Sequence, residues 1–209
     1  MSEGSAMHVA YLVAIVAEAM TAALVAGRRD MDWFGVCVIA SVTALGGGTV
    51  RDVLLGHYPL GWVRHPEYLG YVLVAALSVG IIAPLIVRMK IIFLFLDALG
   101  LVVFTVIGCN VANSLSLPLS IVIASGMITG TCGGVLRDIL CGQIPLLFQK
   151  ELYATVSLAT GLLYIGGGHL GVHHDAAMLT AMGLGLALRL LAIRYEWDMP
   201  RFAYRGKWN

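Results

Sequence analysis

Residues 46–60 read GGGTVRDVLLGHYPL, and residues 132–146 read CGGVLRDILCGQIPL, so a closely similar stretch recurs 86 residues later. Eight of the fifteen aligned positions are identical, among them a glycine pair, the dipeptide Arg-Asp, a further glycine and Pro-Leu. The correspondence extends upstream, where Thr43 aligns with Thr129. A repeat on this scale indicates a duplicated architecture. We call each copy an Arg-Asp motif.

The composition indicates a membrane protein. Hydrophobic residues make up 59% of the 209 residues, charged residues only 12%, and the mean hydropathy is +0.89, whereas an ordinary soluble domain is about 25% charged. The apolar runs are long and continuous, unlike the alternating ten-residue segments of a membrane β-barrel. We therefore predict an all-α integral membrane protein with one membrane domain over residues 1–209. The net charge of +1 gives no indication of nucleic-acid binding.

Seven apolar segments are each close to the roughly 20 residues that a bilayer core requires. The predicted spans are 7–27, 33–56, 68–88, 91–112, 118–142, 151–167 and 174–194. Spans one to three form repeat one (residues 7–90), and spans four to six form repeat two (91–168). Because three is an odd number, the second copy inserts in the opposite orientation, which gives a 3+3 inverted-topology repeat. The seventh helix and a tail at 195–209 stand outside it.

The basic residues predict an orientation. With seven spans, only Arg64 falls in a connection on one side. The connections, the end of span seven and the tail on the other side hold Arg28, Arg29, Arg88, Lys90, Lys150, Arg189, Arg194, Arg201, Arg205 and Lys207. Cytoplasmic connections are rich in Lys and Arg. We therefore expect the N-terminus outside and the C-terminus in the cytoplasm.

The glycine runs Gly46–Gly48 and Gly133–Gly134 lie near the middle of spans two and five. Glycine weakens a helix by roughly 1 kcal/mol per residue relative to alanine. We therefore predict that helices two and five are kinked or broken there, which is tolerated in a membrane only where protein or water satisfies the freed backbone groups. The individual helix-break candidates are Gly46, Gly47, Gly48, Gly133 and Gly134.

Arg51, Asp52, Arg137 and Asp138 follow these glycines within the spans. Each charge at that depth costs at least about 2.5 kcal/mol by insertion scales, so such residues usually have a function. In one interpretation they are structural clips between the halves, with Arg51 paired to Asp138 and Arg137 to Asp52. In the other they line or gate an aqueous path. An Arg-Asp ion pair that holds a pore shut is consistent with both interpretations.

Weaker candidates lie nearby. Hydroxyls can replace the water shell of a cation, although a Ser or Thr in a span is more often bonded to its own helix. The hydroxyl candidates are Thr43, Thr49, Ser125, Thr129 and Thr131. Glu18 is a deep acid that is a candidate for facing the path, Asp97 lies near the cytoplasmic end within reach of water, and Asn110 is a candidate for an interhelical hydrogen bond.

No resident metal or other cofactor is expected. Cys37, Cys109, Cys132 and Cys141 form no CxxC pair and suit small apolar positions. All six histidines fall on the predicted outer side, where they allow a response to external pH. His169, His173 and His174 can be read as metal ligands or, more simply, as loop histidines without a role.

At these residues the sequence resembles a known family. GGGTVRDVLLG with CGGVLRDILCG, seven spans and a 3+3+1 organisation look like the bacterial branch of the trimeric intracellular cation (TRIC) channels, which overlaps a bacterial glycine-transporter-like family. The resemblance runs from about Val9 to Arg194. It implies a homotrimer in the bacterial inner membrane, with one pore per protomer lined by kinked helices two and five. It further implies permeation of K⁺, with Na⁺ discriminated against only modestly, and Arg51, Asp52, Arg137 and Asp138 as pore or gating residues.

Two functions remain open on the sequence. The first is a passive K⁺-permeable channel. The second is a secondary transporter of glycine or another small amino acid, because Arg and Asp beside glycine-broken helices can hold a carboxylate and an ammonium. An enzyme is disfavoured because HExxH, GxSxG and Walker GxxxxGK[ST] are all absent from the sequence. A purely structural scaffold would not require buried charge in both repeats.

Overall fold

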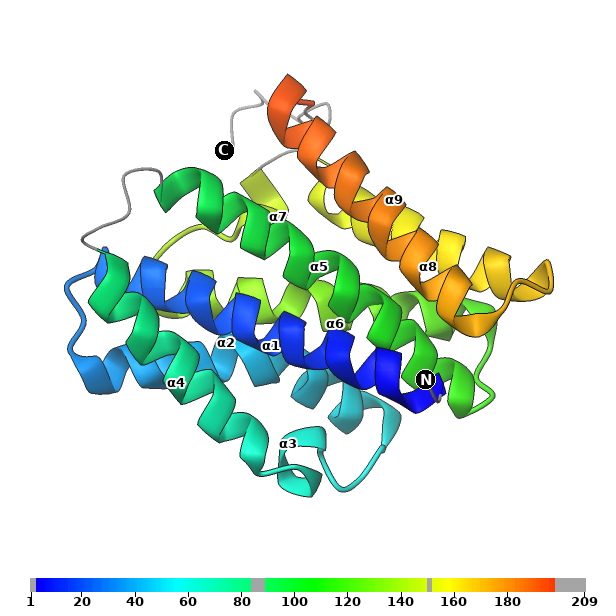
Figure 1. Cartoon of the computed structure of the whole chain (residues 1–209), viewed down its shortest axis with the longest axis horizontal. Coiled ribbons are helices and arrows are strands. Elements are labelled where there is room, and N and C mark those ends of the chain that lie inside the picture. The colour runs from blue at the N-terminus through cyan, green and yellow to red at the C-terminus, as the bar shows by residue number, and fades with distance from the viewer. Residues whose placement is uncertain (1–2, 84–88, 150–151, 198–209) are drawn as a thin grey trace, which may run out of the picture.

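The computed structural model describes residues 3–83, 89–149 and 152–197, which form helices and connections without a strand. Five of the helices are long and apolar enough to cross a membrane (Figure 1). They are α1 (Glu3–Gly27), α2 (Trp33–Leu55), α5 (Met89–Ser114), α6 (Leu119–Leu140) and α9 (His174–Tyr195). The predicted all-α class with several membrane-spanning helices is thereby confirmed.

Four shorter helices complete the described chain. Two of them, α4 (Glu67–Ile82) and α8 (Tyr153–His169), coincide with the predicted third and sixth spans. The other two, α3 (Gly61–Arg64) and α7 (Leu146–Gln149), each follow an Arg-Asp motif. The end of the predicted third span, residues 84–88, lies outside the described residues. A total of seven membrane crossings therefore stays a prediction.

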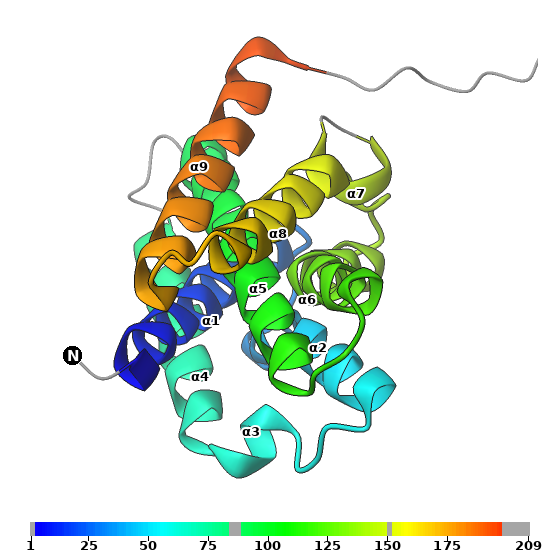
Figure 2. The same cartoon turned by 90° about the vertical axis from the view of Figure 1, so that its right-hand side faces the viewer.

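The long helices alternate in direction. Tyr11 of α1 lies 6.0 Å from Phe104 of α5 between ring centroids, and Glu18 lies against Gly100, so α1 and α5 run antiparallel. At the opposite end from Tyr11, Arg29 Nη2 donates to the Gly142 carbonyl at 3.5 Å, just after α6. We name the two ends of the molecule the Arg51 end and the Arg137 end. Figures 1 and 2 show α8 and α9 side by side on one flank of α5.

The helices α2 and α6 cross in direct backbone contact. A Cβ added to Gly47 would overlap the Thr129 carbonyl oxygen, and a Cβ added to Gly133 would overlap the Thr43 carbonyl oxygen. Gly47 and Gly133 occupy equivalent positions in the two copies, and so do Thr43 and Thr129. The contact is therefore reciprocal, and it brings together the same five-residue segment of each copy, residues 43–47 and 129–133.

The predicted break at the glycines is wrong. The helix α2 is continuous through Gly46, Gly47 and Gly48, and α6 is continuous through Gly133 and Gly134. Because the missing side chains of Gly47 and Gly133 are used for close approach of the two backbones, the glycines here serve packing rather than interruption. A kink without loss of helical structure stays a prediction.

A second glycine contact joins α6 to α5. A Cβ on Gly126 would meet the Thr105 carbonyl oxygen at 2.8 Å, and a Cβ on Gly130 would meet that of Leu101 at 2.7 Å. Separations under 3.0 Å essentially never occur for real Cβ atoms. The spacing of small residues along α6 therefore corresponds to a real helix contact, as such spacing predicts in membrane proteins.

The α2–α6 contact generates the first testable prediction. Gly133→Ala should lower the thermal stability of the detergent-purified protein, because the added methyl group meets the fixed backbone at Thr43, and such overpacking costs about 1–3 kcal/mol. Gly183→Ala on α9 is the matched control, since nothing lies within 4 Å of its Cβ position. Alanine there should be neutral or stabilising. Equal melting temperatures for the two variants would refute the contact.

Candidate functional site

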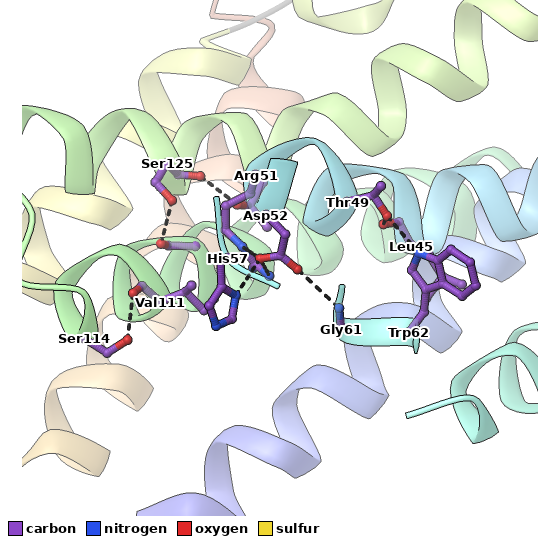
Figure 3. Close-up of polar contacts among 12 residues, drawn as sticks. Leu45, Thr49, Arg51, Asp52, His57, Gly61, Trp62, Val111, Ser114 and Ser125 are labelled. Atoms are coloured by element: carbon purple, nitrogen blue, oxygen red, sulfur yellow. Dashed lines mark hydrogen bonds and ion pairs between the residues drawn. The ribbon is translucent and has the colours of Figure 1, made fainter. Parts of the chain in front are cut away.

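The first Arg-Asp motif lies at the end of α2 and fastens the following loop (Figure 3). Arg51 donates from Nε at 2.9 Å and from Nη2 at 2.8 Å to Asp52 Oδ1. His57 Nδ1 lies 3.0 Å from the same oxygen, and the Gly61 backbone N–H donates to Asp52 Oδ2 at 3.3 Å. Asp52 is 1% exposed. Its carboxylate thus joins the last turn of α2 to α3.

The turn after α2 makes this arrangement possible. Gly56 is the C-cap in the left-handed region, with φ 64°, and its N–H bonds to carbonyls of the last turn, including that of Asp52. A glycine adopts this conformation without the steric penalty of a Cβ. The chain then reverses, so that Trp62 Nε1 donates to Thr49 Oγ1 at 3.2 Å (Figure 3).

The second Arg-Asp motif lies at the end of α6 and has a wider set of partners. Arg137 donates from Nε to Asp138 Oδ1 at 2.8 Å and from Nη1 to Asp97 Oδ1 at 2.9 Å. Arg137 Nη1 also lies 3.1 Å from Thr21 Oγ1 and 3.8 Å from Glu18 Oε2. The Arg137 side chain is fully buried, so α1, α5 and α6 are held together around one guanidinium.

Two further contacts complete this cluster. The Phe93 ring centroid lies 4.9 Å from Arg137 Cζ, a cation–π geometry. The Leu146 backbone N–H donates to Asp138 Oδ2 at 2.9 Å, as Gly61 does to Asp52 in the other copy. Each aspartate therefore accepts from its neighbouring arginine and from the start of the short helix that follows. The two motifs share this local arrangement and differ in what surrounds it.

The predicted pairing across the halves is wrong. Arg51 bonds to Asp52 and not to Asp138, and Arg137 bonds to Asp138 and not to Asp52. The physical reason is the geometry of the crossing. Each arginine follows the antiparallel α2–α6 contact by one turn, so the two arginines lie toward opposite ends of the molecule.

The hydroxyl candidates donate to backbone carbonyls. Four threonine hydroxyls donate to the carbonyl four residues earlier on their own helix, at 2.7–2.8 Å: Thr43, Thr49, Thr129 and Thr131. Ser125 instead crosses to α5 and donates to the Gly108 carbonyl at 2.8 Å. The hydroxyl hydrogens of all five residues are therefore used in bonds to helix carbonyls, and the four threonines follow the common pattern of bonding to their own helix. Oxygen lone pairs remain, and in Thr49 one of them accepts from Trp62.

Besides Asp138, two further acids lie in the Arg137 cluster, Glu18 and Asp97, and of these two only Glu18 is predicted from the sequence as a pathway candidate. The expectation that Asp97 reaches water is wrong, because Asp97 is 1% exposed and bonded to Arg137. No feature of the sequence points directly to Thr21, whose hydroxyl donates to Glu18 and accepts from Arg137. One feature of the sequence could have identified Asp97: it is an acid inside an apolar span, at the same end of the molecule as Arg137.

Of the histidines in the segment 169–174, His174 lies in a hydrogen-bonded group with Tyr164 and Asn110. Tyr164 Oη donates to Asn110 Oδ1 at 2.9 Å and lies 3.1 Å from His174 Nε2, which confirms the interhelical role predicted for Asn110. Within the described residues no group of three His, Cys, Asp or Glu side chains is placed to hold a metal ion. The four cysteines are free thiols.

Known proteins match this chain over most of its length. The family described as Glycine transporter matches residues 8–84 and again 94–169. The chain belongs to this family. The two matched segments begin 86 residues apart, as the two Arg-Asp motifs do.

Relatives and solved structures agree with the assignment. The UPF0126 inner membrane protein YadS of Escherichia coli strain K12 is 37% identical, over 88% of this chain and 90% of its own length. A TRIC cation channel studied for conductance superposes with a TM-score of 0.87 at 32% identity, covering 96% of this chain and 98% of that one. A TRIC trimeric intracellular cation channel orthologue from Rhodobacter sphaeroides also gives 0.87, at 31% identity over 90% and 97%. The resemblance to the bacterial TRIC channels is thereby confirmed, and the chain is a multi-pass membrane protein.

The difference between the two motifs generates a stability prediction. Arg137→Gln should destabilise the protein by about 3–5 kcal/mol, because it leaves buried carboxylates without their cation. Arg51→Gln should cost less, since Asp52 keeps His57 and Gly61 as partners. Thermal melting of the purified variants measures both.

A double mutant separates charge from packing in this test. Adding Asp97→Asn to Arg137→Gln should recover part of the loss, because one uncompensated charge is removed. No recovery would show that Arg137 acts through packing alone, against Phe93 and Thr21.

Proposed function

We propose that the protein is a homotrimeric, K⁺-permeable cation channel of the bacterial inner membrane, with one pore in each protomer lined by α2 and α6. The observation that carries the proposal is the position of the two Arg-Asp motifs. They are buried charges at opposite ends of a pair of antiparallel, membrane-length helices. Intramembrane charges of this kind mark ion pathways.

The relation between α2 and α6 supports this assignment. The helices α2 and α6 carry the same motif, run antiparallel and contact each other through equivalent glycines. We propose a pseudo-two-fold axis in the membrane plane that passes through this crossing, with seven spans in a 3+3+1 order. Transport proteins with inverted repeats place the permeation site where the copies meet. The pathway then runs along the α2–α6 interface, past Thr43 and Thr129.

The contact at Gly47 and Gly133 leaves no space between the two backbones, so the described conformation is closed in this proposal. Conduction requires α2 and α6 to separate at the crossing. Separation exposes the second lone pairs of the Thr43 and Thr129 carbonyls, which lie at this contact, and such oxygens replace part of a cation's hydration shell. Arg51 and Arg137 then act at the two mouths, while Thr49, Ser125, Thr131 and Glu18 remain secondary pathway candidates.

The orientation follows the same proposal. Among the described residues, Arg28, Arg29, Lys90 and Arg194 lie at the Arg137 end, and Arg64 lies at the Arg51 end. By the positive-inside rule the Arg137 end faces the cytoplasm. The N-terminus is then outside and the C-terminus cytoplasmic. Five basic residues that contribute to the sequence argument lie outside the described residues: Arg88, Lys150, Arg201, Arg205 and Lys207.

A transporter of glycine or another small amino acid is the second candidate. The match to the family described as Glycine transporter favours it, and each motif offers one guanidinium and one carboxylate. Such a pair can hold the two charges of a zwitterion. The two candidates differ in the rate and saturation of transport rather than in the residues involved.

Planar bilayers containing the purified protein distinguish the candidates. We expect discrete single-channel currents in KCl, with smaller currents in NaCl. Arg137→Ala should change these currents, because it removes the charge at one mouth. Liposomes from the same preparation should show no saturable uptake of labelled glycine.

Silent bilayers together with saturable glycine uptake would overturn the channel in favour of the transporter. Arg64→Ala is the control variant for the current measurement, since Arg64 is an exposed residue of α3 outside both motifs. An equal change of current from Arg64→Ala and Arg137→Ala would indicate a general surface-charge effect instead of a mouth formed by Arg137.

A further inference from the structure

The loops that follow the two Arg-Asp motifs differ at one position. At the 86-residue offset His57 corresponds to Gln143. Their backbones are placed alike, since each N–H donates at 2.8 Å to the carbonyl of the motif aspartate, Asp52 or Asp138. Their side chains differ, because His57 Nδ1 lies 3.0 Å from Asp52 Oδ1, whereas no hydrogen bond joins the Gln143 side chain to Asp138 among the described residues. The Arg51 end therefore has an imidazole where the Arg137 end has a neutral amide.

The geometry determines which nitrogen of His57 takes up a proton (Figure 3). The Asp52 carboxylate is ion-paired with Arg51 at 2.8 Å, and an ionised carboxylate only accepts hydrogen bonds. The hydrogen of a neutral His57 ring therefore lies on Nδ1, and Nε2 is the basic nitrogen. The His57 side chain is 28% exposed and that of Asp52 is 1% exposed. A proton from the solution can therefore reach the ring, while the carboxylate stays buried.

A second proton on His57 changes the charge of this motif. Arg51 Nε, Arg51 Nη2 and His57 Nδ1 all bond to the same oxygen, Asp52 Oδ1, and Asp52 Oδ2 accepts from the Gly61 backbone N–H. Arg51 Nη1 is buried without a hydrogen-bond partner among the described residues. With a neutral ring the motif holds one positive and one negative charge. With an imidazolium, two cations face one carboxylate.

The elements packed against α2 do not supply a second counter-charge. Between Asp97 and Arg137 the sequence has no Asp, Glu, Lys, Arg or His, so the adjoining end of α5 and start of α6 are uncharged. Tyr11 of α1 lies within electrostatic reach of Arg51 and Asp52, and a tyrosine is ordinarily neutral below about pH 9. The other titratable groups at this end, on α1, α3, α4 and the loop, are His8, Tyr58, Arg64, His65, Glu67, Tyr68 and Tyr71. The acid among them, Glu67, pairs with His65 at 3.0 Å.

We propose that His57 is a proton-sensing residue at the Arg51 mouth of the proposed channel. Uptake of a proton by Nε2 adds one positive charge beside Arg51, which lowers the local concentration of cations and hence their entry. Histidine is the side chain whose ordinary titration lies between pH 5 and 8. The proposal rests on the proposed function, since it requires a mouth at Arg51. With the Arg51 end outside, acid outside the cell reduces cation flow and acid in the cytoplasm does not.

Single-channel currents in KCl test the proposal. Lowering one chamber from about pH 8 to about pH 5.5 should reduce the current roughly twofold, on the order expected for one charge in partly aqueous surroundings. Acid in the opposite chamber should leave the current unchanged, because a single channel has one orientation. His57→Gln should conduct equally at both pH values. Glutamine suits this position, since Gln143 has the equivalent backbone bond.

His65→Gln is the matched control. His65 makes the same kind of contact, from Nδ1 to the Glu67 carboxylate at 3.0 Å, but the two side chains are 44% and 49% exposed and lie outside both motifs. This variant should retain the full response to acid. A response that survives His57→Gln, or that His65→Gln removes to the same extent, would overturn the proposal. An equal response to acid from both chambers would do so as well.

Nuclear magnetic resonance of the full-length protein in detergent, with ¹⁵N-labelled histidine, measures proton uptake without flux. The imidazole signal that is missing from His57→Gln should shift between about pH 5 and pH 8. A signal that stays constant over this range would overturn the sensor, whatever the currents show. Currents that do not respond to acid would keep the channel and overturn the sensor. Silent bilayers would instead remove the proposed channel, and the sensing role with it, even where His57 titrates.

Discussion

The backbone contact of α2 with α6 at Gly47 and Gly133 is the constraint on which the rest of the structure depends. A side chain at either glycine would overlap a carbonyl oxygen of the other helix. With an axial rise of 1.5 Å per residue, the arginine four residues later lies about 6 Å along each helix. Because the helices are antiparallel, one crossing places Arg51 toward one end and Arg137 toward the other. The positions of both charged motifs follow from the packing of two residues without side chains.

The two copies have kept the local Arg-Asp arrangement and differ in the first helix of each repeat. Where repeat two has Asp97, repeat one has Tyr11, which packs against Tyr68 with ring centroids 4.8 Å apart. The buried side chains at one end therefore include aromatic rings and one Arg-Asp pair, whereas those at the other end include three carboxylates, Glu18, Asp97 and Asp138. In the proposed channel this difference gives the two-fold arrangement a direction, since an ion would meet different electrostatic surroundings at the two ends.

The sequence predicted the fold class well because membrane helices depend on the length and polarity of segments, which are local properties. The predicted segments coincide with described helices to within a few residues, apart from the part of span three at 84–88. The effect of the glycines was not predictable in the same way. Gly47 weakens a helix in isolation, and only the neighbouring backbone at Thr129 shows that it serves packing. The burial of Asp97 was not predictable either, because its partner Arg137 is 40 residues away on another helix.

Closure through helix backbones has a mechanical consequence for the proposed channel. Because α2 and α6 remain helical through the glycines, moving them apart breaks no backbone hydrogen bond and sacrifices only van der Waals contact and the close fit of Gly47 and Gly133. Arg137 opposes this motion, since its bonds join α6 to Asp97 on α5 and Thr21 on α1. Arg51 has no such bond to another long helix among the described residues. The Arg51 end of α2 is therefore the less tethered one, and opening that begins there leaves the charged cluster at the other end intact.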